Sequence, residues 1–96
     1  MEFASAATES IFNGESTKAS RKLLPTNLVD VARRKLAMLE AAQQLLDLSV
    51  PPNNRLEKLI GDREGQYSIR INDQYRVCFD WDDEPHATAV EIIDYH

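Results

Sequence analysis

Three arginines lie close together in the second half of this sequence. Arg63, Arg70 and Arg76 fall within fourteen residues, and the chain then runs on to Asp94-Tyr95-His96. A guanidinium group presents a planar fork of N–H donors that matches carboxylate and phosphate oxygens. Residues 61–81 and the last three residues are therefore the starting point for any argument about function.

Two stretches around these arginines alternate between apolar and polar residues, as strands with one buried face do. In residues 66–72 the apolar set is Tyr67, Ile69 and Ile71, against Ser68, Arg70 and Asn72. In residues 75–81 it is Tyr75, Val77, Phe79 and Trp81, against Arg76, Cys78 and Asp80. We predict an antiparallel hairpin.

The register of the hairpin follows from the pattern. A two-residue turn at Asn72-Asp73 mixes apolar and charged residues on both faces. A three-residue loop at 72–74 gives one face that is apolar throughout, and Asn or Asp can adopt the left-handed conformation that such a loop needs. We therefore predict these opposed pairs: Ile71 and Tyr75, Ile69 and Val77, Tyr67 and Phe79.

The same register sets Arg70 opposite Arg76, and Ser68 opposite Cys78. Like charges directly opposed on a sheet repel by up to about 1 kcal/mol relative to neutral pairs. Either an internal carboxylate or an external phosphate can lie between the two guanidinium groups. The pattern leaves an arginine–acid network and an anion-binding site equally open.

The remaining reactive side chains give weaker signals. His96 has Asp94 and its own carboxylate nearby, which predicts a pKa above the usual imidazole value. It matters only if residues 87–95 form a strand that brings it near Arg76. Two arginines on its face could lower the pKa of Cys78, but no local histidine can act as its base, so we interpret it as a half-buried structural cysteine. His86, in an acidic turn, is expected to be exposed.

The elements around the hairpin are predicted as helices first and strands after. Residues 1–3 suit a short strand, and residues 5–12 a short helix capped by Ser5. Residues 14–24 are polar and indicate a loop. An apolar stripe predicts a long helix capped by Asn27 and ended by the residues 49–52; the stripe is Leu28, Ala32, Leu36, Leu39, Ala42 and Leu46. Residues 55–59 are either helical or extended, and residues 87–93 form a third strand. The order favours an α+β fold with an antiparallel sheet.

Composition narrows the class of protein. Ninety-six residues with 43% hydrophobic and 28% charged residues indicate one folded domain, residues 1–96. The sequence lacks a membrane span, a leader pattern and metal-ligand spacing, and a single cysteine fits a reducing compartment, so we expect a cytoplasmic protein. The net charge is −5, which argues against a nucleic-acid binder. The charge is polarised, however: residues 18–35 carry six basic side chains and one acid, and residues 80–94 carry six acids and no lysine or arginine.

Motifs spread over nearly the whole chain resemble the HigB/GraT branch of the RelE/ParE toxin superfamily. Spacing, strand order and the C-terminal ending agree together, and the "RKLAMLEAA" part of the long helix fits as well. The residues that carry the resemblance are Asn54-Arg55-Leu56-Glu57, Gly61-Asp62-Arg63-Glu64-Gly65-Gln66, Ser68-Ile69-Arg70, Asn72-Asp73, Arg76, Phe79 and Glu91-Ile92-Ile93-Asp94-Tyr95-His96.

The resemblance implies an α+β fold with two N-terminal helices packed on a small curved antiparallel sheet. It implies the toxin of a type II toxin–antitoxin module that cleaves mRNA on the ribosome without a metal or cofactor. The implied partners are the ribosome with its mRNA and a HigA-like helix-turn-helix antitoxin. Operator DNA would be bound only through the antitoxin, and no membrane is involved.

Site residues are implied by motif position. The ribose 2′-OH attacks the neighbouring phosphate, with Arg76 stabilising the developing charge and His96 acting as general acid or base. Tyr95 and Asp94 fall where relatives stack or orient the RNA and the histidine. Phosphate or ribosomal RNA contacts are assigned to Arg63 and Arg70, with Lys58 or Arg55 as additional sources of positive charge.

Some positions depart from the family pattern. Where some relatives carry a lysine and a histidine, this sequence has Ile60 and Glu57, which implies a smaller set of acid–base groups. Two alternative functions follow. One is a non-catalytic toxin that acts by binding, as in the gyrase-inhibiting branch. The other is a weakened toxin whose main role is antitoxin-dependent repression of its operon.

Overall fold

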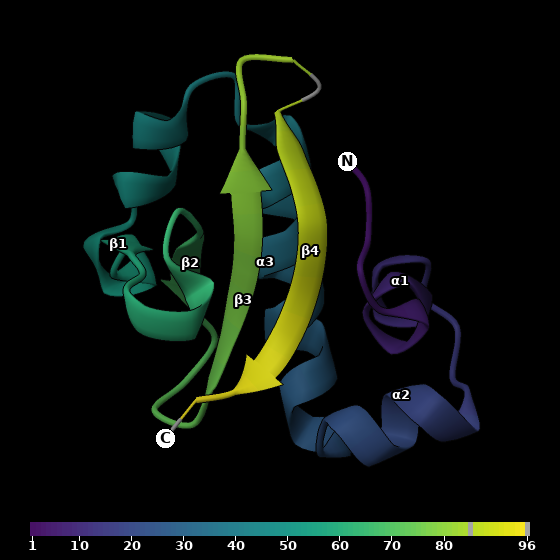
Figure 1. Cartoon of the computed structure of the whole chain (residues 1–96). Coiled ribbons are helices and arrows are strands. Elements are labelled where there is room, and N and C mark those ends of the chain that lie inside the picture. Colours follow the sequence, from purple (N-terminus) through teal and green to yellow (C-terminus); the bar gives the residue numbers. More distant parts are fainter. Residues whose placement is uncertain (85, 96) are drawn as a thin grey trace.

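The computed structural model describes residues 1–84 and 86–95, and shows helices packed against one antiparallel sheet of order β1-β2-β3-β4 (Figure 1). The strands are β1 (Glu57–Lys58), β2 (Tyr67–Arg70), β3 (Tyr75–Trp81) and β4 (Ala87–Asp94), and the helices are α1 (Ala6–Phe12), α2 (Lys18–Leu23) and α3 (Val29–Ala41). Short 3-10 helices occupy Thr26–Leu28, Leu45–Ser49, Pro52–Asn54 and Gly61–Arg63. The predicted α+β class is confirmed, and the architecture is consistent with a RelE-like fold.

The hairpin of β2 and β3 has the predicted register. The opposed pairs are Tyr67 with Phe79, Ser68 with Cys78, Ile69 with Val77 and Arg70 with Arg76. The loop at 72–74 is closed by the Asn72 side chain, whose Oδ1 accepts hydrogen bonds from the backbone N–H groups of Gln74 (2.9 Å) and Tyr75 (2.8 Å). The three-residue loop is therefore confirmed, with an asparagine fixing its conformation.

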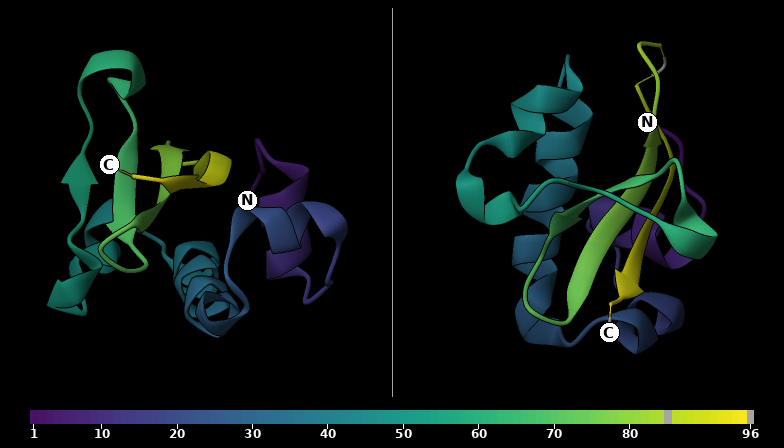
Figure 2. Two further views of the ribbon diagram at one scale, coloured as in Figure 1. Left: turned by 90° about the horizontal axis from the view of Figure 1, so that it is seen from below. Right: turned by 60° about the vertical axis from the view of Figure 1, so that its left-hand side comes forward.

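The core lies between the apolar face of the sheet and α3. Ile69, Val77 and Phe79 are fully buried, as are Leu36 and Leu39 of α3. Seen from below, α3 lies on one face of the sheet, and α1 and α2 lie beyond β4 (Figure 2). The segment between β1 and β2 crosses the opposite face, so both faces of the sheet are covered. A bulge between Cys78 and Asp80 of β3, opposite Ala89 at φ 51°, interrupts the ladder to β4 and agrees with a curved sheet.

The N-terminal residues secure the outer edge of β4. The predicted first strand is present only as a single parallel bridge between Phe3 and Val90. Ser5 caps α1 as predicted, through a hydrogen bond from the Thr8 N–H (3.2 Å). The Thr8 side chain is fully buried, and its Oγ1 accepts a hydrogen bond from Ile92 N–H at 3.0 Å. Helix α1 is therefore tied directly to a strand.

The prediction of a loop at 14–24 is wrong, because this segment contains α2. Thr17 and Ser20 form reciprocal caps: Thr17 Oγ1 accepts from Ser20 N–H at 3.0 Å, and Ser20 Oγ accepts from Thr17 N–H at 2.9 Å. Arg21 and Lys22 lie in the last turn, where positive charge interacts favourably with the helix dipole. A serine in place of the usual Glu or Gln hid this capping box from the sequence pattern.

The bounds predicted for the long helix are also wrong. It starts after a 3-10 turn rather than at an Asn27 cap, and it ends at Ala41. The Asp47 carboxylate accepts hydrogen bonds from the N–H groups of Gln43 and Gln44, both at 3.0 Å, which starts a new turn in place of the helix. Leu46, predicted to pack on the sheet, is consequently 73% exposed.

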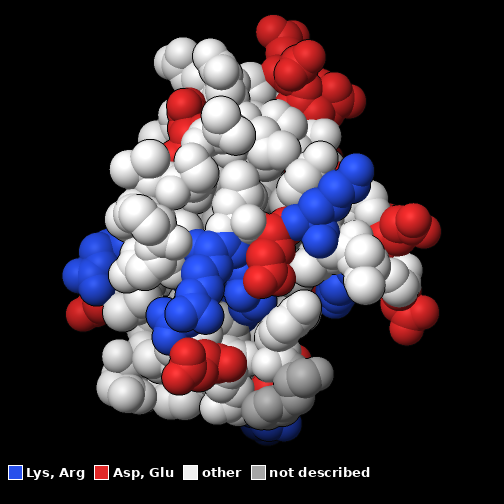
Figure 3. All heavy atoms as spheres, turned by 90° about the vertical axis from the view of Figure 1, so that its left-hand side faces the viewer, with Lys and Arg blue, Asp and Glu red and all other residues white. Residues whose placement is uncertain are grey.

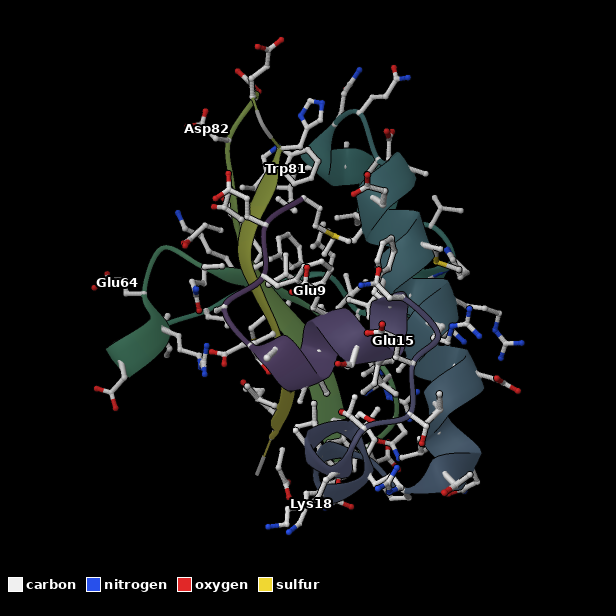
Figure 4. All side chains as sticks on the ribbon, turned by 90° about the vertical axis from the view of Figure 1, so that its right-hand side faces the viewer. Glu9, Glu15, Lys18, Glu64, Trp81 and Asp82 are labelled. Carbon is white, nitrogen blue, oxygen red and sulfur yellow. The ribbon has the colours of Figure 1, made fainter. Side chains whose placement is uncertain are left out.

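Two further predictions are resolved by the sheet and its last turn. Residues 57–58 are extended and pair with β2, so the segment 55–59 is not a helix. His86 is half-buried rather than exposed, and its ring stacks on Trp81 with 5.3 Å between centroids. Figure 4 shows Trp81 and Asp82 where β3 runs into this turn.

None of the helices in the described part of the chain is long and apolar enough to cross a membrane.

Candidate functional site

Arg76 is the central residue of the candidate site. It lies in β3 on the sheet face that points away from α3, and it is only 7% exposed. Its Nε donates a hydrogen bond to Ser68 Oγ at 2.7 Å, and its Nη2 donates to the backbone carbonyl of Arg55 at 2.5 Å. A strand hydroxyl and a loop carbonyl therefore fix the plane of the guanidinium group.

An acid and an aromatic ring complete the surroundings of Arg76. Glu57 Oε1 lies 3.8 Å from Arg76 Nη1, which is within ion-pair range but too long for a hydrogen bond. The Tyr95 ring lies against the guanidinium, with 5.5 Å between Cζ and the ring centroid, in cation–π geometry. Tyr95 itself is 40% exposed.

A groove of about 470 Å³ opens beside Arg76, between β1, the 3-10 turn after it and the end of β4. Glu57 and Tyr95, which both contact Arg76, belong to its wall. The remaining lining residues are Lys58, Leu59, Ile60, Asp62, Arg63, Ile93 and Asp94. Four of the eight site residues proposed from the sequence therefore line one groove, and Arg76 lies at its edge.

Arg63 and Arg70 are each paired with an acid of the same chain. Arg63 Nη2 lies 2.8 Å from Glu91 Oε1, and Arg70 Nη2 donates to Asp73 Oδ1 at 2.6 Å. The hydrogen bond and charge of Arg70 lower the pKa of Asp73. Arg70 and Arg76, which oppose each other on neighbouring strands, are thus paired with different carboxylates, Asp73 and Glu57, as in the arginine–acid network that the sequence left open.

The face around the groove carries mixed charge. Figure 3 shows basic and acidic side chains interleaved over β1 and β2, and acids gathered at the upper end, over the turn between β3 and β4. Lys18, from the basic stretch at 18–35, points out on the opposite side of the molecule, together with Glu9 and Glu15 (Figure 4). The start of the basic stretch therefore lies away from the groove.

The comparison with known families decides the class of protein. A family model described as the RelE-like toxin HigB of type II toxin–antitoxin systems matches residues 1–96. The chain belongs to the HigB-like toxin family. Its resemblance to this branch, inferred above from the motifs, is confirmed.

Two relatives of this HigB-like chain align over part of their length. Toxin HigB-1 of Vibrio cholerae is 47% identical over 62 residues, 65% of this chain and 65% of that protein. An uncharacterized protein of Haemophilus influenzae is 42% identical over 59 residues, 62% of this chain and 58% of that protein. The chain thus spans less than two thirds of the length of each relative.

The structure places the predicted site residues of the HigB-like chain in two groups. Tyr95, Lys58, Arg63 and Asp94 line the groove beside Arg76. Asp94 also accepts a hydrogen bond from Gln74 Nε2 at 3.0 Å, next to the hairpin loop. Arg55 and Arg70 lie outside the groove lining, near Asp73. His96 lies outside the residues that the structure describes, so its predicted role stays a prediction.

Three side chains that matter for the geometry were missed or misjudged. Ser68 was placed on the arginine face, diagonal to Arg76, but its hydrogen bond to Arg76 was not predicted. Glu57 was considered only as a departure from the family, whereas it is the acid nearest Arg76. Cys78 is fully buried, and burial raises the pKa of its thiol, which outweighs the opposite effect of Arg63 and Arg76. The suggested lowering is therefore wrong, and the structural interpretation stands.

Among residues 1–84 and 86–95, no group of three or more His, Cys, Asp or Glu side chains is arranged to hold a metal ion.

Proposed function

We propose that this HigB-like chain is the toxin of a type II toxin–antitoxin module and that it cleaves mRNA on the ribosome. Membership of the family supports the first part. The second part rests chiefly on one observation: Arg76 is held in a fixed orientation at the edge of a groove, with the half-exposed Tyr95 ring against it. A rigid guanidinium beside an aromatic ring matches a nucleotide, which offers a phosphate and a base at neighbouring positions.

The proposed reaction needs neither metal nor cofactor. The ribose 2′-oxygen loses its proton and forms a bond to the adjacent phosphorus, while the bond from phosphorus to the 5′-oxygen breaks. The 5′-oxygen gains a proton, so the products are a 2′,3′-cyclic phosphate and a 5′-hydroxyl. Arg76 stabilises the charge that develops on the phosphate oxygens, and His96 transfers the protons. Tyr95 stacks on a base, and Asp94 orients the histidine or the RNA.

Binding of RNA replaces internal acids by phosphates. Glu57 lies 3.8 Å from Arg76 and is half-exposed, so a phosphate can take its place without breaking a direct hydrogen bond. Arg70 must likewise exchange Asp73, an almost fully exposed side chain, for RNA. Arg63, Arg70, Lys58 and Arg55 are the proposed contacts to the backbone of mRNA or ribosomal RNA. The strong charge dependence of such contacts makes the affinity sensitive to salt.

The proposed partners follow from the type of module. A HigA-like helix-turn-helix antitoxin binds the toxin, and operator DNA is contacted only through that antitoxin. Toxin and target meet in the cytoplasm, where translating ribosomes are found.

The test is a cleavage assay with purified protein, an mRNA and translating ribosomes. Arg76→Ala should lower the single-turnover cleavage rate by at least about 100-fold, the effect of removing one donor to a developing charge. Arg34→Ala, an exposed arginine of α3, is the matched control and should cleave like the wild type. RNA without ribosomes should remain intact. The proposed site is wrong if Arg76→Ala and deletion of His96 both leave cleavage and growth arrest unchanged.

A binding-only function is the second candidate, and the paired charges favour it. Arg63, Arg70 and Arg76 each have a carboxylate of the chain within 4 Å, and the net charge is −5. Such a site competes less well for RNA, as expected of a toxin that acts by binding another target or mainly tunes its operon. Growth arrest with intact mRNA would support this candidate and contradict cleavage.

A further inference from the structure

Lys35 is a buried charge that the proposed reaction does not use. It lies in α3, is 8% exposed, and its Nζ donates a hydrogen bond to Asn54 Oδ1 at 2.5 Å. None of the ion pairs found in residues 1–84 and 86–95 involves Lys35. Burial, Arg34 and Arg70 all lower the pKa of the Lys35 ammonium group. An apolar side chain of the same length would occupy this position at lower cost.

The partner of Lys35 is a fully buried asparagine that holds a loop. Besides accepting from Lys35, the Asn54 side chain donates through Nδ2 to the carbonyls of Leu48 (3.1 Å) and Val50 (3.4 Å). Donors and acceptor of this amide are therefore all used. Asn54 fixes the end of the Pro52–Asn54 turn relative to helix α3, because it accepts from Lys35 and also donates weakly to Met38 Sδ of the same helix at 3.7 Å.

The residue after Asn54 delivers the carbonyl that orients Arg76. Arg55 has left-handed backbone angles, φ 46° and ψ 56°, which are uncommon for a residue other than glycine. This conformation needs support from its surroundings. It turns the Arg55 carbonyl toward Arg76, which donates to it through Nη2. A continuous chain of contacts thus runs from α3 through Asn54 and the Arg55 backbone to the guanidinium group.

We infer that Lys35 and Asn54 are positioning residues for Arg76. Lys35 anchors Asn54 to α3, Asn54 fixes the turn, and the turn places the carbonyl that sets the plane of the guanidinium. The inference rests on the proposed function only in that Arg76 acts on the phosphate; the orientation itself is a property of the free protein. Small losses of orientation lower rates strongly, with about 100-fold for a displacement of 1 Å.

The primary test measures the guanidinium directly. In labelled wild-type protein, NMR follows solvent exchange of the Arg76 side-chain N–H protons. Lys35→Met keeps the length of the side chain and removes the buried charge. It should speed this exchange about tenfold, which corresponds to the loss of one hydrogen bond. Lys35→Gln, a milder change that still carries a donor, should give an intermediate rate. Arg33→Met, which removes an exposed charge from the same helix that is not among the groups acting on Lys35, should not alter the rate.

Cleavage kinetics provide the second readout. Lys35→Met and Asn54→Ala should each lower the single-turnover rate at saturating ribosomes at least about tenfold and change half-saturation less than this, because neither residue is itself a proposed RNA contact. The double variant should be no worse than the slower single variant, since both act through one chain of contacts.

The outcomes separate the two proposals. If the Arg76 side-chain protons exchange at the wild-type rate in both Lys35→Met and Lys35→Gln, the positioning role is overturned, whatever the kinetics show. If exchange is faster in the variants but the wild-type protein cleaves no mRNA, the positioning role is supported and the proposed function is contradicted. Faster exchange with an unchanged cleavage rate overturns the link between orientation and catalysis.

Discussion

Ser68 determines how Arg76 can act. Its side chain is fully buried, and its hydroxyl accepts the hydrogen bond from Nε, the inner nitrogen of the guanidinium. This leaves the outer nitrogens to the Arg55 carbonyl and to Glu57. Arginine usually loses much side-chain freedom when it binds a phosphate, and here that loss has already occurred in the free protein.

The first prediction concerns this hydroxyl. Ser68→Ala leaves Arg76 Nε–H buried without its acceptor, so the free energy of unfolding should fall by about 1–3 kcal/mol. Urea unfolding measures the change. Ser49→Ala, which removes an exposed hydroxyl bonded only to Leu46 O, is the control and should be nearly neutral. An unchanged free energy of unfolding in Ser68→Ala would mean that water replaces the hydroxyl as the acceptor for Arg76 Nε–H.

The second prediction concerns Asp73, which competes with RNA for Arg70. Asp73→Asn removes the competing charge and should strengthen binding of single-stranded RNA, with a salt dependence steeper by about one phosphate contact. Fluorescence anisotropy of a labelled RNA over a range of salt concentrations measures both. Asp83→Asn removes the same charge from the distant acidic turn and should change the affinity less. Equal effects of the two variants would show that the change in affinity comes from net charge and not from competition between Asp73 and RNA for Arg70.

The Asp73–Arg70 pair also predicts a pH dependence. The pKa of Asp73 is lowered in the folded state, so any stabilisation by the pair is complete above the ordinary aspartate pKa. It is lost as the pH falls through the lowered value. Asp73→Asn should therefore lack this part of the acid-side decline in stability, and the Arg70 side-chain NMR signals should no longer shift in that range. Because Asp73 is highly exposed, the effect on stability should be small.

At the scale of elements, the outer edge of β4 is covered by its own N-terminal segment. The backbone of Glu2 and Ala4 forms hydrogen bonds with the backbone of Ala87 and Val90. Further along the strand, the Thr8 hydroxyl accepts a hydrogen bond from the Ile92 N–H group. An open strand edge would invite pairing with another chain. Helix α1 therefore protects the strand that leads into Asp94 and Tyr95.

The third prediction tests this cover. Thr8→Val keeps the shape of the side chain but removes the acceptor for the Ile92 N–H, which is buried. The free energy of unfolding should fall by about 1–3 kcal/mol, and the Ile92 amide should exchange faster with solvent. Thr26→Val, at an exposed position, is the control. Unchanged protection of the Ile92 amide would show that the hydroxyl is dispensable.

At the scale of the whole molecule, the sheet could be predicted because its pattern is local. Strand alternation and loop length determine the register of β2 and β3, and both can be read from about fifteen neighbouring residues. The partners of Arg76 could not be predicted in this way. Glu57 approaches it from β1, which pairs with β2, and Arg55 from the left-handed turn just before β1. The site therefore depends on a contact between distant parts of the chain.

The helices show where a local sequence pattern fails to predict the structure. Lys35 is not part of the apolar stripe of the long helix, yet it is buried. The length of α3 was overestimated because Leu46 continues the helical spacing, whereas the Asp47 side chain takes over the free N–H groups. Periodicity does not register such competition between side chain and backbone. The role of His96 stays a prediction.

The fourth prediction treats the chain as one folding unit with a single core. Leu36→Ala removes a fully buried side chain between α3 and the sheet, so it should cost about 2–5 kcal/mol. Leu46→Ala, at a 73% exposed position, should change stability by less than about 0.5 kcal/mol. Calorimetry and far-UV circular dichroism should give the same single transition. Two separate transitions would contradict a single domain.

The stacking of His86 on Trp81 has a spectroscopic consequence. Trp81 is the one tryptophan of the sequence, and it lies at the far end of β3 from Tyr75, whose opposed residue is Asp94. Six residue steps along the strand, roughly 20 Å, separate Trp81 from the end of β3 that lies opposite Asp94. Its emission therefore reports on the turn between β3 and β4. Any change of emission on adding RNA would reveal a rearrangement transmitted along the strand, rather than a base in contact with the indole.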